Sequence, residues 1–228
     1  MDIYNKRRLE THYCNIYKQN RSKLLQGGVG DVFLVSPETD ARMSLALLIR
    51  IDESISGRIY ESLEKIEAVE PNLYFYPKED FHITVMDILK GIPNRAIPDN
   101  IEAYIQCIKE CTDTIEPFHI EFRGMTASDN AVLVKGYYEY GLEKLRRLLR
   151  KIFAEKHLLL EERYETFSSH ITVVRIPDKL TNPDKFITCI QTDDNFGTMK
   201  VDSFEFVFHN WYDSQKTVLS RFNLLANL

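Results

Sequence analysis

Two identical four-residue motifs carry the clearest chemical information in this sequence. They read His-Ile-Thr-Val and begin at His82 and at His170. Each lies in an apolar stretch that predicts a β-strand, and side chains alternate between the two faces of a strand. Each motif therefore presents an imidazole and a hydroxyl on one face and two aliphatic side chains on the other.

A pair of imidazoles is suited to acid/base chemistry, because one ring can accept a proton near neutral pH while the other donates one. Cleavage of a phosphodiester needs both steps: the attacking oxygen loses a proton and the leaving oxygen gains one. The threonine hydroxyls can donate hydrogen bonds to the non-bridging phosphate oxygens as negative charge grows there. We predict a metal-independent reaction without cofactors, with catalytic residues His82, Thr84, His170 and Thr172. The pattern leaves open which histidine is the acid.

The elements that must position the motifs occur twice. The first half predicts a strand, a helix, an extended region and a second helix, at 43–51, 55–66, 73–88 and 101–114. The second half predicts two strands, a helix and a strand, at 118–122, 131–137, 142–157 and 170–176. A short helix at 183–190 and a hairpin of 201–208 with 217–223 follow. Since the two motifs take equivalent places, the chain contains two similar units.

Paired motifs of the form H-Φ-[S/T]-Φ, where Φ is apolar, resemble the two-histidine (2H) phosphoesterase superfamily. That group includes 2′,5′ RNA ligase-like enzymes and cyclic phosphodiesterases. The resemblance covers about residues 43–224 and implies an α+β fold, bilobal and pseudo-symmetric, with two antiparallel sheets flanking a central cleft and helices outside. It also implies that His82 and His170 are the acid/base pair and that Thr84 and Thr172 bind the phosphate.

The predicted domain organisation is an N-terminal extension followed by one domain. Residues 1–40 are expected to form a helix and a flexible glycine-rich joint at Gly27-Gly28-Val29-Gly30, without a catalytic role. Residues 41–228 are expected to form the 2H phosphoesterase-like domain, with lobes at about 41–116 and 117–228.

Aromatic and basic residues near the motifs are candidates for substrate binding. Tyr76, Tyr164 and Trp211 are the aromatic side chains chosen as partners for a stacked base. Arg175 extends the second motif to His-Ile-Thr-Val-Val-Arg, a form common in the superfamily, but strict alternation puts it on the face opposite His170. A structural role and a substrate contact therefore both stay open for Arg175. Four basic residues on the predicted helix 142–157 are expected on a solvated face: Arg146, Arg147, Arg150 and Lys151.

Composition limits the partners. The chain has 228 residues, 44% of them hydrophobic, and a formal charge of −5, so it should fold alone and should not coat long nucleic acid. The expected partner is a small nucleotide or an RNA end. Without an apolar run typical of a membrane span or a secretory signal, we expect a cytoplasmic monomer that does not bind membranes. The four cysteines lack metal-ligand spacing, so no metal site is predicted.

The substrate and two alternative functions stay open at this point. The phosphodiester could be 2′,3′-cyclic, 2′,5′-linked or part of a cyclic oligonucleotide, and ligase activity is equally undetermined. A non-catalytic nucleotide-binding module would use the same fold. A metal-dependent hydrolase is the third class, but two histidines are too few for a zinc site and the nearby Asp80 and Asp87 follow no ligand pattern.

Overall fold

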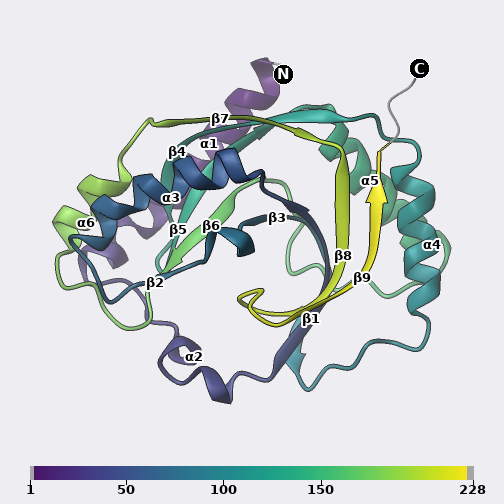
Figure 1. Ribbon diagram of the computed structural model, residues 1–228, viewed down its shortest axis with the longest axis horizontal. Coiled ribbons are helices and arrows are strands. Elements are labelled where there is room, and N and C mark those ends of the chain that lie inside the picture. Colours follow the sequence, from purple (N-terminus) through teal and green to yellow (C-terminus); the bar gives the residue numbers. More distant parts are fainter. Residues whose placement is uncertain (1–2, 225–228) are drawn as a thin grey trace.

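Two antiparallel β-sheets form the centre of the molecule in a computed structural model, which describes residues 3–224 (Figure 1). Sheet A has the strand order β3-β1-β8-β9 and sheet B the order β2-β6-β5-β4-β7. The strands of sheet A are β1 (Arg42–Arg50), β3 (His82–Pro93), β8 (Ser203–Asn210) and β9 (Lys216–Asn223). Those of sheet B are β2 (Tyr74–Phe75), β4 (Phe118–Ala127), β5 (Ala131–Tyr138), β6 (Ile171–Arg175) and β7 (Asn195–Val201).

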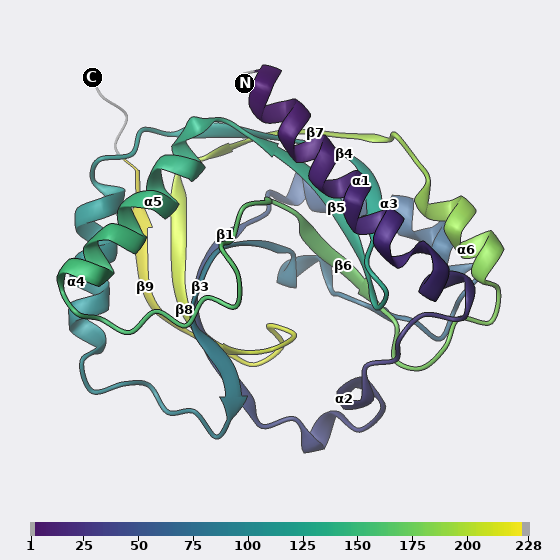
Figure 2. The same ribbon diagram turned by 180° about the vertical axis from the view of Figure 1, so that it is seen from behind.

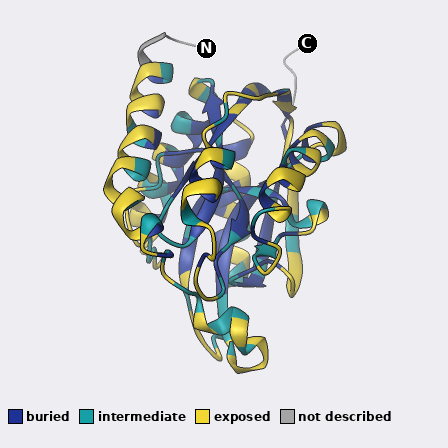
Figure 3. Ribbon diagram, turned by 90° about the vertical axis from the view of Figure 1, so that its left-hand side faces the viewer, coloured by how far each residue is buried: buried dark blue, intermediate teal, exposed yellow. Residues whose placement is uncertain are grey.

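Helices cover the outside of the sheets (Figures 1 and 2). They are α1 (Ile3–Leu25), α2 (Val32–Val35), α3 (Glu53–Glu67), α4 (Ile101–Thr112), α5 (Tyr140–Glu155) and α6 (Pro183–Ile190), with 3-10 turns η1 (Pro37–Thr39) and η2 (Lys78–Asp80). The longer helices are amphipathic: α3, for example, buries Ile55, Ile59, Leu63 and Ile66 at helical spacing. Figure 3 shows the consequence, with buried residues gathered in the strands and on the inward faces of the helices.

The predicted fold class is confirmed, and most of the predicted elements are present with shifted ends. The predicted extended region 73–88 is instead divided by the 3-10 turn η2 into β2 and β3, which belong to different sheets, and β7 was not predicted. The assignment of strands to sheets, however, does not follow the two halves of the sequence. The β8–β9 hairpin near the end of the chain joins β1 and β3 in sheet A, whereas β2 from the first half pairs with β6 in sheet B. The division of the chain into an extension and one domain with two lobes stays a prediction.

The N-terminal helix is packed into the core. On α1, Leu9, Tyr13 and Leu24 belong to the same buried cluster as the strands. After the helix ends, Gly28 has φ +78° and a Cβ there would come within 2.9 Å of the Asp129 carbonyl oxygen, so this position requires glycine. The Val29 amide then donates to the same carbonyl. The segment predicted as a flexible joint is therefore held against the domain.

Candidate active site

Both histidine motifs face one cavity of about 190 Å³. His82 opens β3 and His170 directly precedes β6, so each sheet contributes one imidazole and one threonine. All eight residues predicted for the site line this cavity: Tyr76, His82, Thr84, Tyr164, His170, Thr172, Arg175 and Trp211. Tyr76 is almost fully buried, whereas Tyr164 is 64% exposed at the rim. The imidazoles of His82 and His170 therefore line the same cavity, which joint action on one ligand requires.

A β-bulge follows the threonine in each motif and changes the face of the residues after it. In β6 two residues, Val173 and Val174, are buried in succession, and the pairing with β5 shifts there. In β3 the pairing with β1 shifts in the same place, after Thr84. Arg175 and Asp87 therefore return to the cavity face. The expectation from strict alternation that Arg175 lies opposite His170 is wrong, because alternation does not anticipate a bulge.

The hydrogen bonds of the two imidazoles differ. His82 Nδ1 lies 2.8 Å from the Asp80 carbonyl oxygen, which can only accept, so Nδ1 carries a proton and a neutral His82 presents an unprotonated Nε2. His170 Nδ1 lies 2.8 Å from the Ser168 hydroxyl, which can donate or accept. His170 can therefore change its protonation without losing this hydrogen bond.

Burial controls the charge of both rings. Desolvation lowers the pKa of His82 to about 4, against the opposing effect of the Asp213 carboxylate. Desolvation also lowers the pKa of His170 to about 4, and the positive charge of Arg146 acts in the same direction. Both imidazoles are therefore neutral at pH 7 in the free protein.

A buried arginine connects the two motifs. Arg146 on α5 is 2% exposed, and its guanidinium donates to four backbone carbonyls. Two of these, at Thr84 and Val85, belong to the first motif, at 2.9 and 2.7 Å. The other two, at Phe167 and Ser168, precede the second, both at 2.8 Å. The prediction of a solvated position is wrong for Arg146, whereas Arg147 and Lys151 on the same helix are exposed as expected.

Three guanidinium groups surround the ring of Trp211 beside the cavity. Arg42, Arg163 and Arg175 lie 5.0, 5.2 and 5.6 Å from the ring centroid, within the range of a cation–π contact. Arg175 also donates to the Tyr76 hydroxyl at 2.8 Å. Sequence analysis missed Arg163, which lines the cavity next to Tyr164 and follows no recognisable pattern. The rim therefore combines aromatic surface with positive charge.

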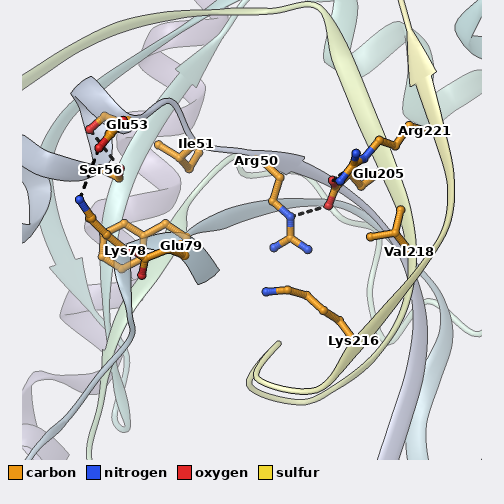
Figure 4. A pocket seen from close by; sticks show the side chains of 11 residues that line it. Arg50, Ile51, Glu53, Ser56, Lys78, Glu79, Glu205, Lys216, Val218 and Arg221 are labelled. Carbon is orange, nitrogen blue, oxygen red and sulfur yellow. Dashed lines mark hydrogen bonds and ion pairs between the residues drawn. The ribbon is translucent and has the colours of Figure 1, made fainter.

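A second, larger cavity of about 540 Å³ has no histidine among its lining residues (Figure 4). Its cations are paired with acidic groups: Arg50 donates to Glu205 at 2.7 Å, and Arg221 donates to the same carboxylate at 2.9 Å. Lys78 lies 3.6 Å from Glu53. Because these charges are compensated and no histidine is present, the smaller cavity is the candidate active site.

Two findings on the described residues concern metal-ligand groups and membrane-spanning helices. Within residues 3–224 no three histidine, cysteine, aspartate or glutamate side chains are grouped as metal ligands. In the same range no helix is both long enough and apolar enough to cross a bilayer.

Solved structures with the same fold include bacterial proteins. Protein TT0787 of Thermus thermophilus has 17% sequence identity and a TM-score of 0.58, and the match covers 82% of this chain and 100% of that one. LigT of E. coli in its apo form has 15% identity and a TM-score of 0.58, with 80% and 98% covered. E. coli LigT has also been solved with 3′-AMP, at 15% identity, a TM-score of 0.56 and the same coverage. A search of curated proteins gave no match.

The sequence itself matches a family model. The matched segment, residues 53–210, includes both histidine motifs and most of the strands that position them. This match spans more than half of the chain, and the structural neighbours share its two-sheet arrangement. The chain belongs to the 2′-5′ RNA ligase superfamily, the 2H phosphoesterases.

Proposed function

We propose that this protein is a metal-independent phosphodiesterase that cleaves a nucleotide phosphodiester by acid/base catalysis with His82 and His170. The observation that carries the proposal is the convergence of both His-x-Thr motifs on one cavity. An imidazole from each sheet can then reach opposite sides of a single phosphorus atom. Thr84 and Thr172 donate hydrogen bonds to its non-bridging oxygens.

The hydrogen bonds of the imidazoles support an assignment of roles. His82, with its Nδ1 proton on the Asp80 carbonyl, accepts a proton at Nε2 from water or from a ribose hydroxyl. The Asp213 carboxylate, 3.9 Å from His82 Nδ1, stabilises the resulting positive charge. His170 donates a proton to the departing ribose oxygen, and the Ser168 hydroxyl accommodates the change. The negative charge of a bound phosphate favours the protonated form that the acid requires.

The rim of the cavity supports a nucleotide as substrate. Trp211 and Tyr164 offer aromatic surface for a base, while Arg163 and Arg175 offer positive charge for phosphate. E. coli LigT, which shares the fold, has been solved with 3′-AMP, ATP and NADP+. We infer a small nucleotide or an RNA end with a 2′,3′-cyclic or 2′,5′-linked phosphodiester, or a cyclic oligonucleotide, acted on in the cytoplasm by a monomer.

The test is a screen of 2′,3′-cyclic, 2′,5′-linked and cyclic oligonucleotide substrates in excess chelator, with products identified by mass. We expect turnover by the wild-type protein and a loss of at least about 1,000-fold in His82→Ala and in His170→Ala. Thermal unfolding of each variant is measured in parallel, to check that it is folded. The exposed His119 provides the control, since His119→Gln should keep full activity. Substantial activity in either alanine variant contradicts the proposal.

Two alternative functions give different results in the same screen. A nucleotide-binding module would bind a substrate to saturation without turning it over. A metal-dependent hydrolase would lose its activity in chelator and recover it when a divalent metal is added back.

A further inference from the structure

A third histidine lines the same cavity. His209 is on β8, in the closing hairpin, and the centroid of its ring is 6.1 Å from that of His82. It belongs to neither motif, and the acid/base mechanism proposed above does not use it. Sequence analysis gave it no role because its neighbours do not repeat the His-x-Thr pattern.

A buried carboxylate orients this ring. His209 Nδ1 lies 2.8 Å from Oδ1 of Asp213, which has no exposed surface. Lys216 donates to the same carboxylate at 3.1 Å, and Arg50 also donates to it. Figure 4 shows the charged ends of Arg50 and Lys216 converging from two strands. An ionised carboxylate only accepts, so Nδ1 of His209 carries a proton.

Asp213 lies in the turn between β8 and β9, which places its carboxylate beside the His209 ring. The turn curls inward from sheet A (Figures 1 and 2). Asp213 has φ +60°, a left-handed conformation that is uncommon outside glycine and that aspartate tolerates better than most residues. Asn210 stabilises the turn by donating to Ser214 Oγ at 2.9 Å and accepting from the Gln215 amide at 3.1 Å. Lys216 also donates at 2.5 Å to Asp80, at the end of the 3-10 turn η2 that precedes the first motif.

The second ring nitrogen of His209 is available to a ligand. Among residues 3–224 no hydrogen bond involves Nε2, and His209 lines the cavity beside His82 and Thr84. Although burial acts to raise the pKa of Asp213, the hydrogen bond from His209 and the hydrogen bond and positive charge of Arg50 hold it well below its usual range. With its Nδ1–H held by Asp213, the ring has a fixed orientation, and Nε2 is the nitrogen that can carry the second proton and donate to an anionic ligand.

We propose that His209 is a third catalytic residue, which donates a hydrogen bond from Nε2 to a non-bridging oxygen of the scissile phosphate while Asp213 holds its Nδ1–H. The proposal rests on the proposed phosphodiesterase function and extends it. No proton leaves His209 during the reaction. Its contact stabilises the charge that grows on the phosphate as His82 and His170 move protons.

Two amide substitutions test which nitrogen matters. The side-chain amide of glutamine can place its nitrogen near the position of Nε2, and that of asparagine near Nδ1. We expect His209→Asn to lower kcat about 100-fold and His209→Gln to lower it about 10-fold, with KM changing less than kcat in both. A structural role through Asp213 alone predicts the reverse order, and that result overturns the proposal. His119→Gln, in an exposed histidine–glutamate pair, is the matched control.

A measurement on the wild-type protein separates this proposal from the proposed function. Inorganic phosphate is titrated into ¹⁵N-labelled protein, and the imidazole nitrogen shifts of His209 are followed by NMR. We expect Nε2 to shift at phosphate saturation while Nδ1 keeps its proton. Unchanged His209 signals overturn the proposal. If the protein turns over none of the nucleotides, the phosphodiesterase function fails, but the titration still decides whether His209 binds phosphate.

Discussion

The imidazoles of His82 and His170 are neutral because they are buried, although the chemistry proposed for them requires contact with substrate. His82 keeps 18% of its side-chain surface exposed and His170 also lies between buried and exposed. Desolvation nevertheless lowers both pKa values to about 4. In the unfolded chain a histidine titrates near 6.5. Burial of these two histidines is therefore expected to make the folded protein sensitive to mild acid.

The first prediction concerns stability against pH. Below pH 6.5 the unfolded chain takes up protons that the folded histidines do not, so the free energy of unfolding falls as the pH is lowered from 6.5 to 4. Each histidine should contribute roughly 1–2 kcal/mol to this fall by pH 5. Urea titrations at pH 7 and pH 5 should show a smaller fall in the double variant His82→Gln/His170→Gln than in the wild type. An equal fall in both would mean that burial does not depress these pKa values.

Strands and a helix together set the distance between the motifs. The bulges after Thr84 and Thr172 bring Asp87 and Arg175 onto the cavity face, so equivalent positions of the two motifs carry opposite charges. Arg146 on α5 then connects the backbone of the first motif with the segment before the second. No carboxylate hydrogen-bonds to its guanidinium within residues 3–224, and burial lowers its pKa to about 10. It therefore remains charged and binds carbonyl oxygens.

The second prediction is that Arg146→Met damages both stability and catalysis. Four buried or half-buried carbonyls lose their donor, which should cost about 3–5 kcal/mol of unfolding free energy, measured by urea titration. The folded fraction should have a lower kcat with little change in KM, because the histidines lose their spacing. Arg146→Lys should recover part of both. Arg147→Met, on the exposed face of the same helix, should change neither. Wild-type kcat in folded Arg146→Met would contradict the positioning role.

The whole molecule includes a helix that lies outside the matched family segment. The family model begins at residue 53, but α1 packs on sheet B and inserts Tyr13 into the core. The Tyr13 hydroxyl donates to the Gly136 carbonyl at 2.9 Å and lies 3.3 Å from the Ser169 amide, directly before His170. A Cβ at Gly136 would come within 2.1 Å of the Ser169 carbonyl oxygen, so glycine permits this close approach. Through Tyr13, α1 therefore hydrogen-bonds to the backbone of β5 and to the residue that precedes the second motif.

The third prediction is that removing one hydroxyl from α1 destabilises the protein. Tyr13→Phe leaves buried backbone groups of Gly136 and Ser169 without this partner, which should cost about 1–3 kcal/mol in a urea titration. Tyr17→Phe on the same helix is the control, because within the described residues the Tyr17 hydroxyl accepts only from the exposed Gln191 side chain. Equal stability of the Tyr13 variant and the wild type would show that α1 contributes packing alone.

Local periodicity and a repeated motif predicted most of the helices and strands and pointed to eight of the residues that line the cavity. The two-sheet fold class came from the resemblance that the repeated motif carries, and β7 was not predicted. The tertiary structure determined three further features of the site. The bulge that turns Arg175 inward, the burial of Arg146 and the return of Asp213 to His209 depend on contacts between segments that lie far apart in sequence or on opposite sides of a turn. Such contacts leave no periodic signal, because they are chosen by the free energy of the packed molecule rather than by neighbouring residues.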